Sequence, residues 1–243
     1  KEIKFSQINL KLIENFDSFL RYKLETGDSG IWSRHKNFKA VLGNAFKNSR
    51  LRKNPYDDFK LHQEDPKIES LTSEQLQLIE KIEFSKFPAG RGLELTRDMF
   101  LFSSYSGLRF SDVTALKKEH IGDTTISIKM QKTQKYIEIP LSQKAKRILA
   151  KYIQKDVETI FKKRTNVSVN RDLKKIASLC KIKINLHFHL SRHTYATLIS
   201  NSDANAFTVM QLLGHSDIRM SQRYVKTNIK DLTKTLNKID AFN

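Results

Sequence analysis

The segment SGLRFSDVTAL, at residues 106–116, is the starting point for the fold and the function of this chain. Gly107 stands just ahead of a run whose apolar residues recur at helical spacing, which is typical of a turn that leads into a helix. Taken alone the segment has an ordinary interpretation, because such a glycine is common before helices and Arg109 could simply be solvated. The rest of the sequence decides whether this segment is an ordinary turn before a helix or part of a functional site.

The segment HLSRHTYATLI, at residues 189–199, also has a helical pattern. His189 and Arg192 are three residues apart, so on a helix they share one face. A pair of this kind often arises by chance. His187 and His193 crowd the same segment and raise the question of a metal site, but no acidic residue or cysteine is spaced to complete one. We therefore predict no metal site.

The segment LLGHSDIRMSQRYVK, at residues 212–226, places a histidine in a turn and a tyrosine beyond it. Gly214 is positioned to end a helix. In such a turn His215 would more often be structural than functional, and Tyr224 by itself would be an ordinary half-buried tyrosine. Tyr195 lies in an apolar stretch, so we predict that it packs in the core.

The remaining pattern is mostly helical, with one clear exception. Residues 125–129 and 136–141 alternate isoleucine with polar neighbours, as the strands of a hairpin do. The turn between them carries two lysines, Lys132 and Lys135. The predicted fold is therefore mainly α, with a small antiparallel β-sheet near residues 121–141.

The chain divides into two predicted domains. Residues 1–60 carry helical apolar patterns and form a small helical domain. Residues 61–70 are polar and are predicted to be a linker. Thr72 and Gln75 then form a capping box that opens a helix, so a larger second domain is predicted over residues 71–243.

Composition and charge point to a polyanionic partner. The 243 residues include 44 Lys and Arg against 26 Asp and Glu, a net charge of +18, of which +14 lies beyond residue 70. Such an excess is costly by self-repulsion unless a polyanion is the usual partner, and nucleic acid fits best. The alternative explanations of the positive charge are a surface that keeps the protein in solution or association with the ribosome. The single cysteine excludes an internal disulfide framework, and no stretch is apolar enough to predict a membrane span.

Together the four segments resemble the tyrosine recombinase (phage integrase) family over residues 71–230, and residues 1–60 resemble its core-site DNA-binding domain. Of the two hairpin lysines, Lys132 is preferred because the family's lysine precedes the second strand by several residues. One departure is Ser106, where threonine is frequent. The resemblance implies a six-residue catalytic set: Arg109, Lys132, His189, Arg192, His215 and Tyr224.

The resemblance also implies a metal-free mechanism for site-specific DNA recombination. Tyr224 would attack a phosphodiester and form a covalent 3′-phosphotyrosine, while Arg109 and Arg192 bind the non-bridging oxygens. Lys132 would protonate the leaving 5′ oxygen. Of the two histidines in the set, the first would orient or deprotonate the nucleophile and the second would donate to the phosphate.

The expected partners follow from the same resemblance. They are double-stranded DNA held in a two-domain clamp, further protomers up to a tetramer in the synaptic complex, and accessory DNA-bending proteins. We expect no cofactor, no membrane partner and a cytoplasmic, nucleoid-associated location. The basic residues expected to bind DNA phosphates are Arg34, Lys36, Lys47, Arg50, Lys53, Lys135 and Arg171.

Several alternatives stay open at this point. The chain begins at Lys1 without methionine, and we expect that an arm-binding domain of a mobile-element integrase precedes it. A chromosome-dimer resolvase or an invertase of the same family is an alternative. Two others are a type IB topoisomerase and a catalytically silent DNA-binding regulator. An apolar stripe beyond residue 228 is expected to dock on a neighbouring protomer, with docking on its own protomer as the alternative.

Overall fold

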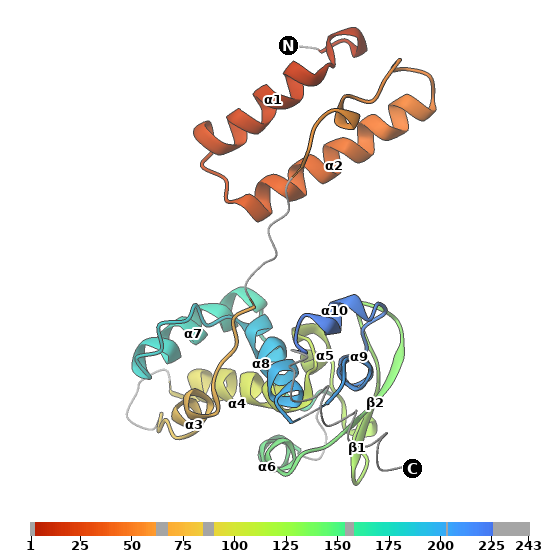
Figure 1. Ribbon diagram of the computed structural model, residues 1–243. Coiled ribbons are helices and arrows are strands. Elements are labelled where there is room, and N and C mark those ends of the chain that lie inside the picture. The colour runs from red at the N-terminus through yellow and green to blue at the C-terminus, as the bar shows by residue number, and fades with distance from the viewer. Residues whose placement is uncertain (1–2, 62–67, 85–89, 154–157, 203, 226–243) are drawn as a thin grey trace, which may run out of the picture. The chain divides into compact units, whose positions relative to one another are not determined.

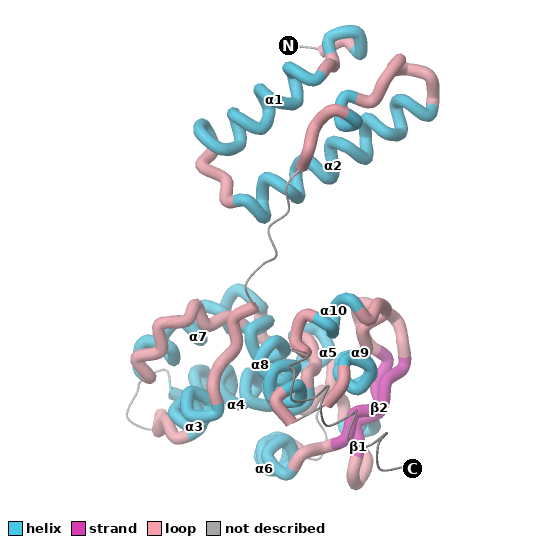
Figure 2. The backbone as a smooth tube through the Cα atoms, viewed as in Figure 1, coloured by secondary structure: helices cyan, strands magenta, loops and turns pink. Residues whose placement is uncertain are grey.

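The computed structural model describes residues 3–61, 68–84, 90–153, 158–202 and 204–225 (Figures 1 and 2). These residues are mostly helical and contain a two-stranded antiparallel sheet, which confirms the predicted fold class. The chain separates into two compact units, Lys1–Lys67 and Ile68–Asn243. Most of the predicted linker and the predicted docking stripe of the tail lie outside the described residues.

The first unit is a small helical domain with its own apolar core. Its elements are the 3-10 turn η1 (Phe5–Gln7), α1 (Leu10–Ser18), the π-helical turn η2 (Phe19–Lys23), α2 (Asp28–Lys47) and the 3-10 turn η3 (Pro55–Asp57). α1 begins where the Asn9 side chain accepts the Leu12 amide at 3.0 Å. The core consists of Ile13, Leu42, Ala45, Leu51 and Tyr56.

The second unit carries the remaining elements. They are α3 (Ser73–Glu80), α4 (Gly90–Ser106), α5 (Phe110–Thr114), the 3-10 turn η4 (Lys118–His120), β1 (Thr125–Lys129), β2 (Tyr136–Pro140), α6 (Gln143–Tyr152), α7 (Asn166–Leu179), α8 (Phe188–Ser200), α9 (Ala206–Leu213) and α10 (Arg219–Gln222). Among the described residues no helix is both long and apolar enough to cross a membrane.

The helix α4 runs through the middle of the second unit. Four consecutive residues, Met99 to Phe102, are each at most 2 % exposed. A helix that is apolar on every side must be covered on every side, and α3, α6, α7 and α8 all pack against it (Figure 1). This central helix therefore fixes α8 and the turn after α4, both of which carry predicted site residues.

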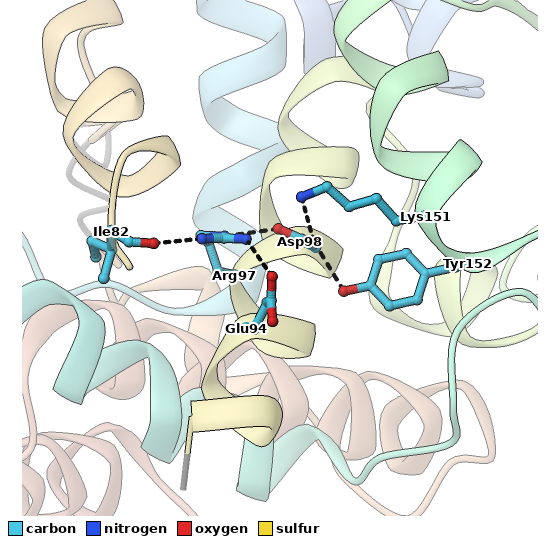
Figure 3. A network of polar contacts seen from close by, with 6 residues as sticks. All are labelled: Ile82, Glu94, Arg97, Asp98, Lys151 and Tyr152. Atoms are coloured by element: carbon cyan, nitrogen blue, oxygen red, sulfur yellow. Dashed lines mark hydrogen bonds and ion pairs between the residues drawn. The ribbon is translucent and has the colours of Figure 1, made fainter. Parts of the chain in front are cut away.

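A buried ionic network joins α4 to α6 away from those residues (Figure 3). Its members are Ile82, Glu94, Arg97, Asp98, Lys151 and Tyr152. The Arg97 guanidinium donates to the Asp98 carboxylate at 2.7 Å and to the Ile82 carbonyl at 2.6 Å. The Tyr152 hydroxyl donates to Asp98 at 2.9 Å. Because every buried charge here has a partner, the network is explained as structural support.

The hairpin forms where the sequence predicts it. β1 and β2 pair antiparallel, with Ile126 opposite Ile139 and Ile128 opposite Ile137. Ile126, Ile128 and Ile139 are at most 2 % exposed, so one face of the ribbon joins the core and the other carries the polar residues. The capping box at the start of α3 also forms as predicted, with the Thr72 side chain accepting the Gln75 amide at 3.2 Å.

Candidate active site

The Arg192 side chain links three segments of the second unit. It projects from α8 and is only 3 % exposed. One terminal nitrogen, Nη1, donates to the Gly107 carbonyl at 2.6 Å, and the other, Nη2, donates to the Leu213 carbonyl at 2.5 Å. Gly107 lies two residues before Arg109, and Leu213 lies two residues before His215. The planar guanidinium fork therefore holds two predicted site turns against α8.

Gly107 makes the first of these turns. Its φ angle is +71°, a left-handed conformation that glycine adopts without strain. A Cβ atom at this position would lie 2.5 Å from Cδ1 of Tyr195, which is buried as predicted. The close approach brings Arg109 to the N-cap of α5, and its side chain is half-buried. Burial lowers the pKa of Arg109, an effect that the nearby Asp112 carboxylate opposes.

Asp112 is a site residue that sequence reasoning missed. It is fully buried in the first turn of α5. Its Oδ2 accepts the Arg109 amide at 3.3 Å, and its Oδ1 accepts the Gln131 amide at 2.8 Å. Gln131 immediately precedes Lys132 in the hairpin turn. Asp112 therefore fixes the base of the lysine-bearing turn next to Arg109; an aspartate three residues after the arginine was the only signal available in the sequence.

The hairpin lysines themselves stay exposed. Both Lys132 and Lys135 face solvent. Within the described part of the chain, no polar contact joins the Lys132 side chain to the other predicted catalytic residues. The structure thus brings the lysine turn to the site without placing the amine in it.

A second left-handed glycine positions His215. Gly214, at the end of α9, has φ of +60°, as the predicted helix end requires. A Cβ there would lie 2.6 Å from the Met130 sulfur, so the hairpin packs directly on this turn. The His215 Nδ1 lies 2.8 Å from the Ser221 hydroxyl. His215 is therefore anchored to the segment that carries Tyr224.

Tyr224 lies in a turn just after α10 and is half-buried. It packs beside a cluster of α8 and α9 side chains that includes Tyr195 and Leu213. The Ser200 hydroxyl donates to its backbone carbonyl at 2.5 Å. Its own hydroxyl lies 2.6 Å from Nδ1 of His193. The sequence pattern favours His189 over His193, so this contact is a finding of the structure.

His189 lies one helical turn before His193 on α8. Its side chain is the more exposed of the two, and its ring meets the His193 ring edge-on, with centroids 4.7 Å apart. His189 therefore contacts Tyr224 only indirectly, through His193. The α8 N-terminus that carries both is tied to α7, because the Phe188 amide donates to the Asn170 side chain at 2.8 Å.

Positive charge accumulates in this region without full compensation. Burial and the neighbouring Arg109 lower the pKa of Arg192 to about 9. Loss of hydration, with Arg192 and Arg109 nearby, lowers the pKa of His215 to about 4. Partial desolvation and the adjacent His193 lower the pKa of His189 to about 4. Groups that repel one another in this way would be stabilised by an anion between them.

The residues predicted to bind DNA phosphates are all on the surface. They are Arg34, Lys36, Lys47, Arg50, Lys53, Lys135 and Arg171. Three of them already have a neighbour. Lys53 pairs with Asp58 at 2.6 Å, and Lys36 lies 5.0 Å from the Trp32 ring centroid. The Arg34 guanidinium donates to the Gly30 carbonyl at 3.4 Å. No group of residues able to hold a metal ion occurs among the described residues.

Replacement of Gly107 by alanine is expected to destabilise the second unit. A non-glycine residue in the left-handed region costs about 1–3 kcal/mol, and the new Cβ would also collide with Tyr195. Urea denaturation of Gly107→Ala should show a lower midpoint than wild type. Gly27→Ala is the matched control, because nothing lies within 4 Å of a Cβ there. Equal midpoints for wild type and Gly107→Ala would contradict the account of this turn.

Stability is expected to fall on acidification, in part through His215. The pKa of His215 is about 4 in the folded protein and near 6.5 in an unfolded chain. Between these values the unfolded state binds a proton that the folded state does not, so stability is lost as the pH falls below about 6.5 and levels off below about 4. The urea midpoint of His215→Asn should drop less between pH 7 and pH 4.5 than that of wild type. Urea midpoints that fall by the same amount in wild type and His215→Asn over this pH range would refute the prediction.

Comparisons with known proteins identify related domains in both parts of the chain. Residues 71–230 match the model of the Phage integrase family, and residues 1–61 match the Phage integrase SAM-like domain. The tyrosine recombinase XerC of Rickettsia bellii is 25% identical over 228 residues, covering 89% of this chain and 72% of the relative. A tyrosine recombinase of Thermosipho africanus is 33% identical over 129 residues, covering 50% of this chain and 46% of the relative.

Solved structures show the same fold. The Tn1549 transposon integrase in complex with circular intermediate DNA superposes with a TM-score of 0.76 at 17% identity, covering 95% of this chain and 86% of that one. A lambda integrase dimer bound to a COC′ core site superposes with a TM-score of 0.74 at 18% identity, covering 94% of this chain and 86% of that one. With the family model matched over most of the sequence, this chain belongs to the phage integrase family and is a tyrosine recombinase, an enzyme of site-specific DNA cleavage and rejoining.

Proposed function

We propose that Arg109, Arg192, His215 and Tyr224 form the centre at which this recombinase transfers a DNA phosphodiester to its own tyrosine. The observation that carries the proposal is the Arg192 fork, which holds the Arg109 turn and the His215 turn together. The same region places Arg109 close enough to Arg192 to help lower the pKa of Arg192, and a bound phosphate would relieve that repulsion. An arrangement of preorganised cations suits a reaction in which negative charge grows on phosphate oxygens.

The reaction proceeds in two reversible steps. The Tyr224 oxygen attacks the scissile phosphorus, and the bond to the 5′ oxygen breaks to leave a 3′-phosphotyrosine and a free 5′-hydroxyl. A 5′-hydroxyl from the partner strand then attacks the phosphotyrosine and releases the enzyme. Arg109 and Arg192 bind the non-bridging oxygens throughout, and His215 donates to them. Because the ester bond is exchanged rather than hydrolysed, no external energy source is needed.

Lys132 supplies the proton for the leaving 5′ oxygen in this proposal. Its turn is anchored beside Arg109 through Asp112 and Gln131, which supports Lys132 over Lys135. The exposed amine would enter the site as DNA is bound. His189 completes the six-residue set. Its ring contacts His193, which in turn contacts Tyr224.

We infer that double-stranded DNA is the partner and that both units contact it, with the seven surface lysines and arginines binding phosphates. The Tn1549 and lambda integrases were solved with DNA, and the net charge of +18 favours the same partner here. The likeness to the Tn1549 transposon integrase supports a mobile-element integrase. We propose in addition that the protein assembles as a tetramer on DNA in the cytoplasmic nucleoid and is aided by DNA-bending proteins. A recombinase of the XerC type is the second candidate, favoured by the sequence relatives.

Covalent capture tests the proposed reaction and selects the DNA site in the same experiment. The protein is incubated with a pool of nicked duplexes randomised over their central segment, so that a cleaved fragment bearing the 5′-hydroxyl diffuses away. Adducts that survive denaturant are recovered and sequenced, and the enriched duplex becomes the standard substrate. No adduct from a pool that the protein binds tightly would favour a silent DNA-binding regulator. With an adduct in hand, strand exchange between two enriched sites separates a recombinase from a type IB topoisomerase, which relaxes supercoils instead.

DNA affinity is expected to depend steeply on salt. Each phosphate neutralised by a lysine or arginine releases a counterion, so log K should fall with log[salt] by about 0.9 per contact. Fluorescence anisotropy with the enriched duplex from 50 to about 200 mM salt measures the slope. Changing Arg50 to alanine should reduce the slope by about one, whereas Lys53→Ala should reduce it less, because Asp58 already pairs with Lys53. Equal slopes for all three proteins would contradict the predicted phosphate contacts.

A further inference from the structure

One residue that contacts the proposed nucleophile, His193, is not among the six with a proposed role in catalysis. Nδ1 of His193 lies 2.6 Å from the Tyr224 hydroxyl, and the two rings are 5.9 Å apart at an interplanar angle of 39°. His193 is half-buried and follows Arg192 directly on α8. Its ring thus faces the atom that the proposed reaction makes the nucleophile.

We propose that His193 is a catalytic residue that accepts the phenolic proton of Tyr224 as the tyrosine attacks DNA. The inference rests on the proposed function, because it needs Tyr224 to be the nucleophile. In the cleavage step the Tyr224 O–H bond breaks and an N–H bond forms at Nδ1 of His193. At the same time the tyrosine oxygen bonds to phosphorus, and the departing 5′ oxygen takes its proton from Lys132. Resealing runs the same transfers backwards.

Geometry makes His193 the better acceptor of the two α8 histidines. The distance to the tyrosine oxygen is within hydrogen-bond reach, as a general base requires. His189 touches the His193 ring instead. The tyrosine cannot easily turn away, because its ring packs on the α8 and α9 cluster and its carbonyl accepts the Ser200 hydroxyl.

The charges around His193 keep it neutral before the reaction. From α8 it faces His187, His189 and Arg192, and from the end of α10 it faces Arg223 and the phenol itself. Burial, together with His187, Arg223 and Arg192, lowers the pKa of His193. A neutral imidazole that accepts at Nδ1 carries its own proton on Nε2. The imidazolium formed during attack would be stabilised by the negative charge that the transition state gathers on the same phosphate.

Two substitutions separate proton transfer from positioning. Asparagine at 193 can place an oxygen near the Nδ1 position, so His193→Asn retains a hydrogen-bond acceptor but takes no proton. His193→Ala removes both. His120→Asn is the matched control, because His120 accepts the Lys117 backbone amide away from this cluster. Melting temperatures establish folding, and if the alanine variant is unstable the near-isosteric asparagine variant carries the test.

The measurement is the single-turnover rate at which each variant cleaves the enriched nicked duplex. Both His193 variants are expected to lose about 10²-fold in rate, with His120→Asn unchanged, and imidazole in the buffer should restore part of the His193→Ala activity. The acid side of the rate–pH profile should disappear in His193→Asn. Wild-type or faster rates for both variants would overturn the inference, as would an asparagine variant that is fully active while the alanine variant is not. Failure of wild type itself to form an adduct would refute the proposed function instead.

Discussion

Tyr224→Phe is expected to abolish the covalent protein–DNA adduct completely while leaving DNA affinity and folding close to wild type. The substitution removes the attacking oxygen and its contact with His193, and phenylalanine keeps the ring that packs beside the α8 and α9 cluster. Denaturing gels with the enriched nicked duplex measure the adduct, and anisotropy measures the affinity.

Tyr195→Phe is the control for that experiment. Tyr195 is 9% exposed, lies three residues after Arg192 and packs against the Gly107 turn. Its role is packing, so the control should form adduct at nearly the wild-type rate. An adduct that persists in Tyr224→Phe and vanishes in Tyr195→Phe would move the nucleophile to α8 and refute the arrangement described here.

Arg192→Lys is expected to lower the single-turnover cleavage rate by about 10²–10³-fold, the loss seen when one preorganised transition-state donor is removed. Lysine keeps a positive charge but lacks the planar fork that reaches two acceptors at once. Arg192 donates hydrogen bonds to both the Gly107 and the Leu213 carbonyls. A lysine at this position could not make both of these hydrogen bonds. Each buried carbonyl left without a partner costs about 1–3 kcal/mol, so the urea midpoint should fall as well.

The two consequences of Arg192→Lys are separable. Cleavage is measured at a temperature where the variant is fully folded, so that any remaining loss is catalytic. Arg219→Lys is the control, because Arg219 is exposed and pairs with Asp217 at 2.8 Å in the same C-terminal segment. A wild-type cleavage rate in Arg192→Lys would show that charge alone suffices and that the fork has no part in the chemistry.

Much of the local structure could be predicted because its causes are local. The buried face of the hairpin follows from the alternation of Ile126 and Ile128 with polar residues, since one face of a two-stranded ribbon must be buried. The start of α3 follows from a reciprocal pair of side chain to backbone hydrogen bonds within four residues. The left-handed end of α9 follows from Gly214, because glycine alone adopts that conformation without strain.

The sequence by itself also predicted the family, which the family model over residues 71–230 confirms. It proposed the residue types of the site as well, because motif spacing on helices and turns can be recognised without the fold. What the tertiary structure decided is which atoms meet. The Arg192 fork joins residues 85 and 21 positions apart, and the His193–Tyr224 contact spans 31 positions. Nothing in a local pattern distinguishes His193 from His189, since both lie on α8 within one turn of Arg192. The packing of α8 and α9 around Tyr224 makes that distinction, because only three-dimensional contacts set the distance from a ring nitrogen to a phenol.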